Sequence, residues 1–136
     1  MIRMLIENDV IFAYMNERDR NHEKAEMLFQ KIRDGLGVEA SSACLLEMEL
    51  VFKSESREDE LLGAITALKG IESIEFLPVT PEIVISSIAI RRNYVLTFFD
   101  SHYAATALSR DRIIISMDTA YDDIPNLNRH EPDEVL

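Results

Sequence analysis

The chain has 136 residues, of which 47% are hydrophobic and 29% are charged. This length predicts one ordinary domain over residues 1–136, and the composition is that of a globular protein rather than a disordered one. No apolar run approaches the roughly 18 residues that a membrane span requires. The N-terminal apolar stretch is interrupted by the charges of Glu7 and Asp9, so it is not the core of a signal peptide. The single cysteine, Cys44, excludes an internal disulfide. We therefore expect a cytoplasmic protein with no membrane partner.

The charge balance is strongly acidic, with 14 basic and 25 acidic residues and a net charge of −11. Proteins that hold nucleic acid by electrostatic attraction alone usually present a basic patch, so this balance argues against passive binding of that kind. It does not argue against an enzyme that reaches phosphates through bound metal ions, because such ions invert the local charge.

Short apolar runs alternate with segments of helical spacing along the whole chain. In chain order, the expected elements are a strand at Ile2–Ile6, a helix capped by Asp9, a helix at His22–Arg33, a strand at Val38–Ser41, a helix that opens at Ser42, a helix at Arg57–Lys69, a strand at Ile74–Leu77, a helix at Pro81–Arg92, a helix at Phe99–Ser109, a strand at Arg112–Ile115 and a short edge strand in the tail after Pro125. This alternation predicts an α/β protein of three layers, α/β/α, with a central, mostly parallel sheet of four or five strands. The helix that opens at Ser42 is apolar nearly all round, which predicts a central position for it.

Acids follow several of the predicted strands. In parallel sheets, ligands bind beyond the carboxyl ends of the strands, so these acids are the first candidates for a site. Glu7 and Asp9 follow the first strand, and Asp118 follows the fourth. Glu47 lies in the first turns of the helix after the second strand, and Asp100 lies at the start of the last predicted helix. We expect these regions to converge at one edge of the sheet.

Three of these acids, Glu47, Asp100 and Asp118, have strongly apolar neighbours in the segments LLEME, FFD and ISMD. A carboxylate that is buried there without a partner is costly, so each needs a partner, a metal ion or a raised pKa. Few cations lie near them in the chain, and a hard divalent cation such as Mg²⁺ or Mn²⁺ relieves the repulsion between like charges. Metal held by carboxylates suits phosphodiester hydrolysis by an activated water, without a covalent nucleophile.

Four segments resemble the PIN-domain family, which includes the VapC-type toxin ribonucleases. They are IENDVIFAYMNERDRNHEKA, SSACLLEMEL, FFDSHYAATAL and IISMDTAYDDIP, and they span nearly the whole chain. The resemblance implies catalytic, metal-binding acids at Glu7, Glu47, Asp100 and Asp118, with Ser116 as a supporting hydroxyl. It also implies a Mg²⁺- or Mn²⁺-dependent endoribonuclease that cleaves single-stranded RNA and is often a homodimer. In toxin members of the family, an antitoxin protein covers the site.

Two positions depart from the family pattern. The first acid is normally aspartate, whereas the aligned residue here is Glu7, and the position two later is usually Asn or Ser, whereas here it is Asp9. Asp9 can therefore take over part of the ligand role, and we include it among the candidate metal ligands. Simpler interpretations stay open, with Glu7 as a solvated strand end, Asp9 and Asp118 as helix caps, and Asp100 as a first-turn acid that favours the helix dipole.

Three functional hypotheses follow. The first is an active ribonuclease, the toxin of a VapBC-type toxin–antitoxin pair. The second is a PIN-like scaffold that binds RNA or a protein partner with little or no cleavage, which the Glu7 departure and the acidic charge favour. The third is a phosphoacceptor domain of the response-regulator type, which also gathers acids after strands but needs a downstream lysine that Lys69 is poorly placed to supply. Binding of Mg²⁺ or Mn²⁺, seen as a raised melting temperature, separates the first hypothesis from the second.

Overall fold

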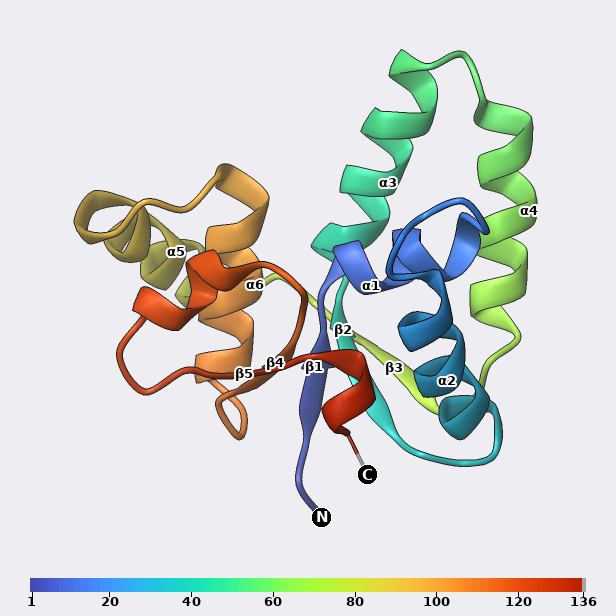
Figure 1. Cartoon of the computed structure of the whole chain (residues 1–136). Helices are drawn as coiled ribbons and strands as arrows, with labels where there is room; N and C mark the ends of the chain where they lie inside the picture. The colour runs from blue at the N-terminus through green and yellow to red at the C-terminus, as the bar shows by residue number, and fades with distance from the viewer. Residues whose placement is uncertain (136) are drawn as a thin grey trace.

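The centre of the protein is a five-stranded sheet in which every strand pair is parallel. The computed structural model describes residues 1–135. The strand order is β3-β2-β1-β4-β5 (Figure 1). The strands are β1 (Met4–Ile6), β2 (Val38–Ser41), β3 (Ile74–Leu77), β4 (Ile113–Ile115) and β5 (Asn128–His130). The predicted parallel α/β sheet is confirmed, including the edge strand in the tail.

Six α-helices flank this sheet in the described part of the chain. They are α1 (Asn8–Met15), α2 (His22–Arg33), α3 (Ala43–Ser54), α4 (Glu58–Lys69), α5 (Pro81–Asn93) and α6 (Phe98–Leu108), with 3-10 turns η1 (Thr119–Asp123) and η2 (Pro132–Glu134). In Figure 1, α1 and α2 lie to the right of β1, and α5 and α6 lie to its left. No helix of residues 1–135 is long and apolar enough to cross a membrane.

Side-chain size explains how closely the last helix approaches the sheet. Ala104, Ala105 and Ala107 of α6 are all buried, and Ile114 and Ile115 of β4 are buried as well. Alanine is the best helix former and adds little bulk, so α6 can lie close to the strands without strain. The second half of α6 therefore packs closely against the sheet.

At the starts of α1, α5 and α6, a side chain accepts a hydrogen bond from a free backbone N–H group. Thr80 caps α5 by accepting from the Ile83 N–H at 3.3 Å, with Pro81 at the first helical position as predicted. The prediction that Asp9 caps α1 is wrong, because the helix begins at Asn8, two residues earlier than that cap would place it. Glu7 is the cap, and its carboxylate accepts from the Asp9 N–H at 3.2 Å.

The predicted central position of α3 is also wrong. Leu46 and Leu50 are 59% and 58% exposed, whereas Met48 and Phe52 are buried. Packing covers only one side of α3, and its other apolar side faces outward. The sequence has apolar residues on both sides of this helix, and it does not show which side packs against the protein and which is exposed to solvent.

The strand order places a topological switch between β1 and β4. The chain runs outward from β1 to β2 and β3, and then returns to the other side of β1 through β4. In parallel sheets, ligands bind beyond the carboxyl ends of the strands at such a switch point. Glu7 and Ser116 directly follow β1 and β4 there.

Candidate functional site

The carboxyl ends of β1 and β4 lie side by side, with Ile6 opposite Ile115. The Glu7 N–H donates to the Ile115 carbonyl at 3.0 Å, so the ladder continues to the residue where the acids begin. Ser116 follows β4 directly and is fully buried. Local backbone pairing thus brings together residues that are 109 positions apart in the chain.

Glu7, Asp9 and Ser116 form one hydrogen-bonded group. The Ser116 hydroxyl lies 2.8 Å from Asp9 Oδ2 and 3.2 Å from Glu7 Oε2, and its oxygen accepts from the Asp118 N–H at 3.0 Å. The Met117 N–H also donates to Asp9 Oδ2, at 2.9 Å. Because a hydroxyl has one hydrogen, Ser116 donates to only one of the two carboxylates at a time. The two acids therefore compete for that hydrogen.

Glu47 reaches the same region from α3. Its Oε1 accepts from Asn8 Nδ2 at 2.8 Å and from the Tyr103 hydroxyl at 2.8 Å. Asn8 follows Glu7 at the start of α1, and Tyr103 lies one turn after Asp100 on α6. Glu47 is half-buried, as its apolar flanks predicted.

Asp100 and Asp118 are held at the starts of short helical segments. Asp100 lies in the first turn of α6, where its N–H donates to Thr97 Oγ1 at 3.3 Å. Asp118 caps η1, and its Oδ1 accepts from the Ala120 N–H at 2.9 Å. Both cap-related roles were open at the level of sequence, and neither uses every carboxylate oxygen, so metal binding is compatible with both.

Three buried polar atoms lack a hydrogen-bond partner among the described residues: Asn8 Oδ1, Asp9 Oδ1 and the Tyr121 hydroxyl. Tyr121 is fully buried. Its hydroxyl lies near enough to Asp100 to oppose a rise in the pKa of that acid, although it forms no hydrogen bond of ordinary geometry. Buried polar groups are rarely left without partners, so each of these atoms is open to a further polar ligand.

The acids perturb one another and their surroundings. Burial raises the pKa of Glu7 well above its ordinary value, and the charges of Asp9 and Asp100 add to the rise. Burial also raises the pKa of Asp9 and of Asp100. Burial, with the charges of Glu47 and Glu7, raises the pKa of the Cys44 thiol to about 12. These shifts, caused mainly by burial, disfavour the state in which all of these groups are ionised at once.

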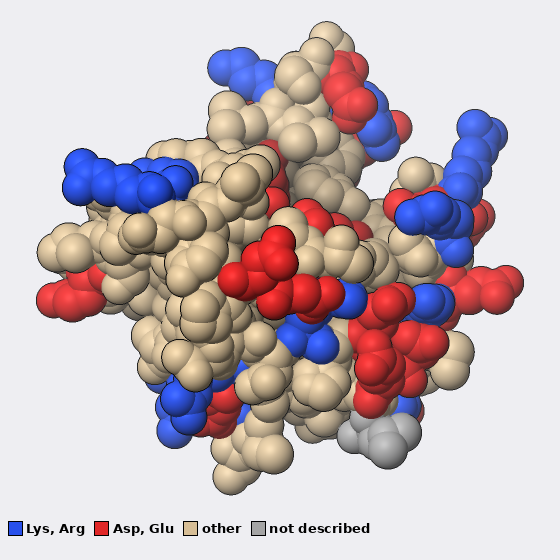
Figure 2. All heavy atoms as spheres, turned by 60° about the vertical axis from the view of Figure 1, so that its left-hand side comes forward, with Lys and Arg blue, Asp and Glu red and all other residues tan. Residues whose placement is uncertain are grey.

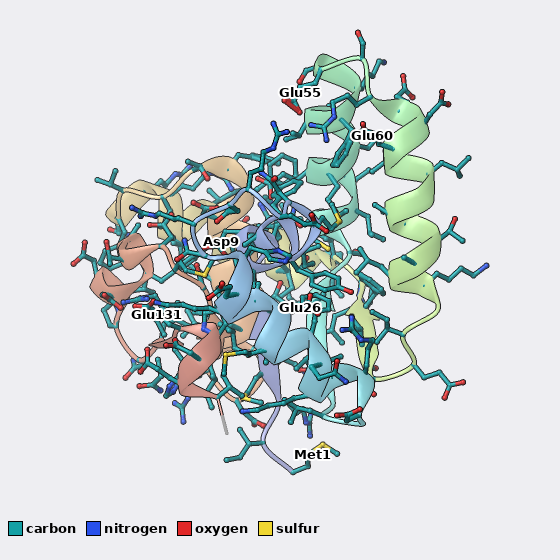
Figure 3. The ribbon with its side chains drawn as sticks, turned by 45° about the vertical axis from the view of Figure 1, so that its right-hand side comes forward. Met1, Asp9, Glu26, Glu55, Glu60 and Glu131 are labelled. Carbon is teal, nitrogen blue, oxygen red and sulfur yellow. The ribbon has the colours of Figure 1, made fainter. Side chains whose placement is uncertain are left out.

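The acids gather without forming a compact ligand cluster. Across residues 1–135, no three Asp, Glu, His or Cys side chains are arranged closely enough to hold an ion as they stand. Figure 2 shows acidic atoms set back in a recess in the middle of one face. In Figure 3, Asp9 lies in the middle of the molecule, whereas Glu55 and Glu60 lie at the far end of α3 and α4.

The donor set fits a hard divalent cation. Asp9 Oδ1 is a buried carboxylate oxygen without a partner. In Glu47 and in Asp118, one carboxylate oxygen accepts hydrogen bonds. The other oxygen of each forms no hydrogen bond within the described residues. Carboxylate oxygens with no thiolate or imidazole among them are the ligands that Mg²⁺ and Mn²⁺ prefer.

Parallel α/β domains with carboxylates at the switch point of the sheet form a class that binds ligands beyond the carboxyl ends of the strands. The PIN domain family model matches residues 4–127, and the chain belongs to this family. Comparison with curated proteins finds no match.

Solved structures show the same fold at low sequence identity. VapBC2 from Rickettsia felis, bound to a DNA fragment from its promoter, has a TM-score of 0.76 at 10% identity, covering 96% of this chain and 98% of that one. VapC20 from Mycobacterium tuberculosis, a toxin that cleaves the Sarcin-Ricin loop, has a TM-score of 0.73 at 15% identity, covering 88% and 92%. DNA-bound VapBC from Salmonella typhimurium has a TM-score of 0.71 at 17% identity, covering 97% and 99%.

Sequence reasoning missed the polar residues that hold the acids. Asn8 and Tyr103 both contact Glu47, and neither was among the predicted site residues. Asn8 stands between two candidate acids, and Tyr103 stands three positions after another, on the same face of its helix. These spacings were readable, but the identity of the carboxylate that they contact depends on the tertiary fold.

Proposed function

We propose that residues 1–136 form one PIN domain that acts as a divalent-metal-dependent endoribonuclease on single-stranded RNA. The observation that carries this proposal is the unpartnered, buried Asp9 Oδ1, which lies among further carboxylates beyond the carboxyl ends of β1 and β4. Membership of the PIN family supports it, because these domains are typically metal-dependent nucleases.

The chain's own side chains have separable tasks in this proposal. Asp9, Glu47, Asp100 and Asp118 hold the cation, Mg²⁺ or Mn²⁺, with Glu7 contributing beside Asp9. Ser116 orients the Glu7 or the Asp9 carboxylate, one at a time, through its single hydroxyl hydrogen. A cation held there would lower the pKa of an attacking water and neutralise charge on the phosphate. No serine, cysteine or histidine nucleophile is required, and the raised pKa of Cys44 keeps its thiol protonated.

An antitoxin protein is the proposed partner, and a second copy of the chain is proposed as well. A groove of about 700 Å³ runs between α1 and the α3–α4 pair and is lined in part by Phe12, Met15, Val51 and Phe52. Related folds were crystallised as toxin–antitoxin complexes, including one from Klebsiella pneumoniae. The exposed apolar side of α3 is available for a homodimer. Light scattering of the purified chain tests the dimer, and a monomeric mass would refute it.

A scaffold that binds RNA or a protein without cutting it is the second candidate. It is favoured by the lack of a ready three-ligand cluster within residues 1–135 and by the net charge of −11. The two candidates differ in their response to Mn²⁺. A nuclease site should raise the melting temperature with metal, whereas a scaffold without a site should not.

The direct test is cleavage of a mixed single-stranded RNA pool with Mn²⁺, with Mg²⁺ and with EDTA. Wild type is compared with Asp100→Asn, which keeps the size of the side chain and removes its charge. We expect metal-dependent cleavage that the variant loses while its circular dichroism spectrum is unchanged. Cleavage by Asp100→Asn at the wild-type rate would refute the site, and no cleavage together with no metal effect would favour the scaffold.

A further inference from the structure

Glu47 has two oxygens in very different situations. Oε1 accepts two hydrogen bonds of 2.8 Å, one from Asn8 on α1 and one from Tyr103 on α6. No hydrogen bond is formed by Oε2 within residues 1–135. A carboxylate oxygen has two lone pairs in its plane, so two donors satisfy Oε1 and leave Oε2 as the group that is open to a further ligand.

Both donors are buried and committed to this contact. Asn8 is fully buried, and Tyr103 is 1% exposed. The second Asn8 N–H donates to the Cys44 carbonyl at 3.2 Å, so reversing the amide would set its oxygen against two acceptors. Burial raises the pKa of Tyr103, and the nearby Glu47 charge adds to the rise, which keeps the phenol neutral and able to donate.

The two donors also link the elements that carry the other acids. Asn8 lies between Glu7 and Asp9, and Tyr103 lies three residues after Asp100. Glu47 is therefore fixed by the same two helices whose acids it faces. A shift of α1 or α6 would move Glu47 together with their carboxylates.

We infer that Tyr103 and Asn8 are positioning residues that hold Glu47 so that only Oε2 is presented to the cation. The inference rests on the metal site proposed above. It assigns Glu47 the role of a ligand through one oxygen. Hydrogen-bonding partners of metal ligands commonly change metal affinity by 10- to 100-fold when they are removed. Because Asn8 remains on Oε1 when the Tyr103 hydroxyl is lost, we expect the lower end of that range.

A purely structural role for Tyr103 predicts a different result. In that case its hydroxyl would only satisfy a half-buried acid and tie α6 to α3. Its loss would then lower the free energy of unfolding and leave cation binding unchanged. Metal affinity and folding stability must therefore be measured on the same protein.

The test is calorimetric titration of Mn²⁺ into the full-length wild type, Tyr103→Phe, Glu47→Gln and the double variant. Phenylalanine fills the same space as tyrosine, so Tyr103→Phe should fold. We expect about tenfold weaker Mn²⁺ binding by Tyr103→Phe. In the Glu47→Gln background the same change should have no further effect, because Tyr103 acts through the Glu47 carboxylate.

Tyr14→Phe is the matched control, because it removes a tyrosine hydroxyl that is hydrogen-bonded to Arg33 and distant from the acids. It should bind Mn²⁺ as wild type does. Equal binding by wild type and Tyr103→Phe would overturn the positioning role alone, as would an undiminished effect of Tyr103→Phe in the Glu47→Gln background. A wild type that binds no Mn²⁺ would overturn the metal site, and the positioning role with it.

Discussion

Replacing Asp9 with asparagine should stabilise the metal-free protein at neutral pH. Asp9 Oδ2 accepts from the Met117 N–H and lies 2.8 Å from the Ser116 hydroxyl, while Oδ1 is buried without a partner. Asparagine has nearly the same shape, and its carbonyl oxygen can keep both contacts. Its amide then places N–H donors where an unpaired oxygen stood, beside the Glu7 carboxylate. One unsatisfied buried acceptor and one like-charge repulsion are removed together.

The expected size of the effect follows from these contacts. A hydrogen bond to a charged group contributes about 1.5–3 kcal/mol, and an unsatisfied buried polar group costs about 1–3 kcal/mol. Asp9 is only partly buried, which weakens both effects. We therefore expect Asp9→Asn to raise the free energy of unfolding by about 1–3 kcal/mol, or the melting temperature by roughly 3–10 °C for a domain of this size.

The pH dependence identifies the cause. Burial raises the pKa of both Glu7 and Asp9. Between the unfolded values near about 4 and the raised folded values, the folded state binds more protons, so stability falls as pH rises through this window. The loss of stability that comes from ionising Glu7 and Asp9 is absent at low pH and fully present above their pKa values in the folded protein. The advantage of Asp9→Asn should therefore be large near neutral pH and small in mild acid.

The assay is thermal unfolding in EDTA, followed by circular dichroism, at about pH 7 and about pH 4. Asp34→Asn serves as a control because it removes an acid at the exposed end of α2. The reasoning is refuted if Asp9→Asn is less stable than wild type near pH 7. It is also refuted if the gain is the same at both pH values, since repulsion between ionised acids would then not be the cause.

Three further outcomes are expected. Glu7→Gln should weaken Mn²⁺ binding less than Asp9→Asn does in calorimetric titration, and the reverse order would contradict the oxygen availability described above. Tyr121→Phe removes a buried hydroxyl without a protein partner, so the free energy of unfolding should change by less than about 1 kcal/mol in urea; a larger loss would reveal a hydrogen bond that the hydroxyl makes. Arg110→Met leaves Glu39 buried without its guanidinium partner and should cost about 2–3 kcal/mol, less than a fully buried pair because Arg110 is 29% exposed; unchanged stability would refute it.

Much of the fold was accessible from sequence because its signals are local. Val38–Ser41 and Ile74–Leu77 are short runs between turn residues, each mostly apolar or small with one glutamate, and both strands have the predicted bounds. Helices of recognisable spacing separate them, which leaves a parallel sheet as the simplest arrangement. The rule that ligands bind beyond strand ends then directs attention to the acids after β1 and β4 without any knowledge of contacts.

The remaining features depend on tertiary contacts that no local pattern encodes. Glu7 and Asp9 are both acceptable helix caps, and the observed choice depends on backbone angles fixed by the ladder between β1 and β4. Tyr103 is an aromatic residue on an alanine-rich helix, and only the packing of α6 against α3 turns its hydroxyl toward Glu47. Leu46 is an apolar helix residue that is 59% exposed, and the sequence alone does not specify whether another surface covers an apolar side chain.

The departures from the family pattern at Glu7 and Asp9 are best understood as one coupled change. Glu7 Oε1 accepts from the Asp9 N–H, and Glu7 Oε2 lies 3.2 Å from the Ser116 hydroxyl, for whose one hydrogen it competes with Asp9 Oδ2. Asp9 keeps one oxygen free of any hydrogen bond within the described residues. The longer acid thus serves as the helix cap, and the extra acid two residues later offers the open oxygen. The added negative charge is stable only when a cation is bound or one acid is protonated.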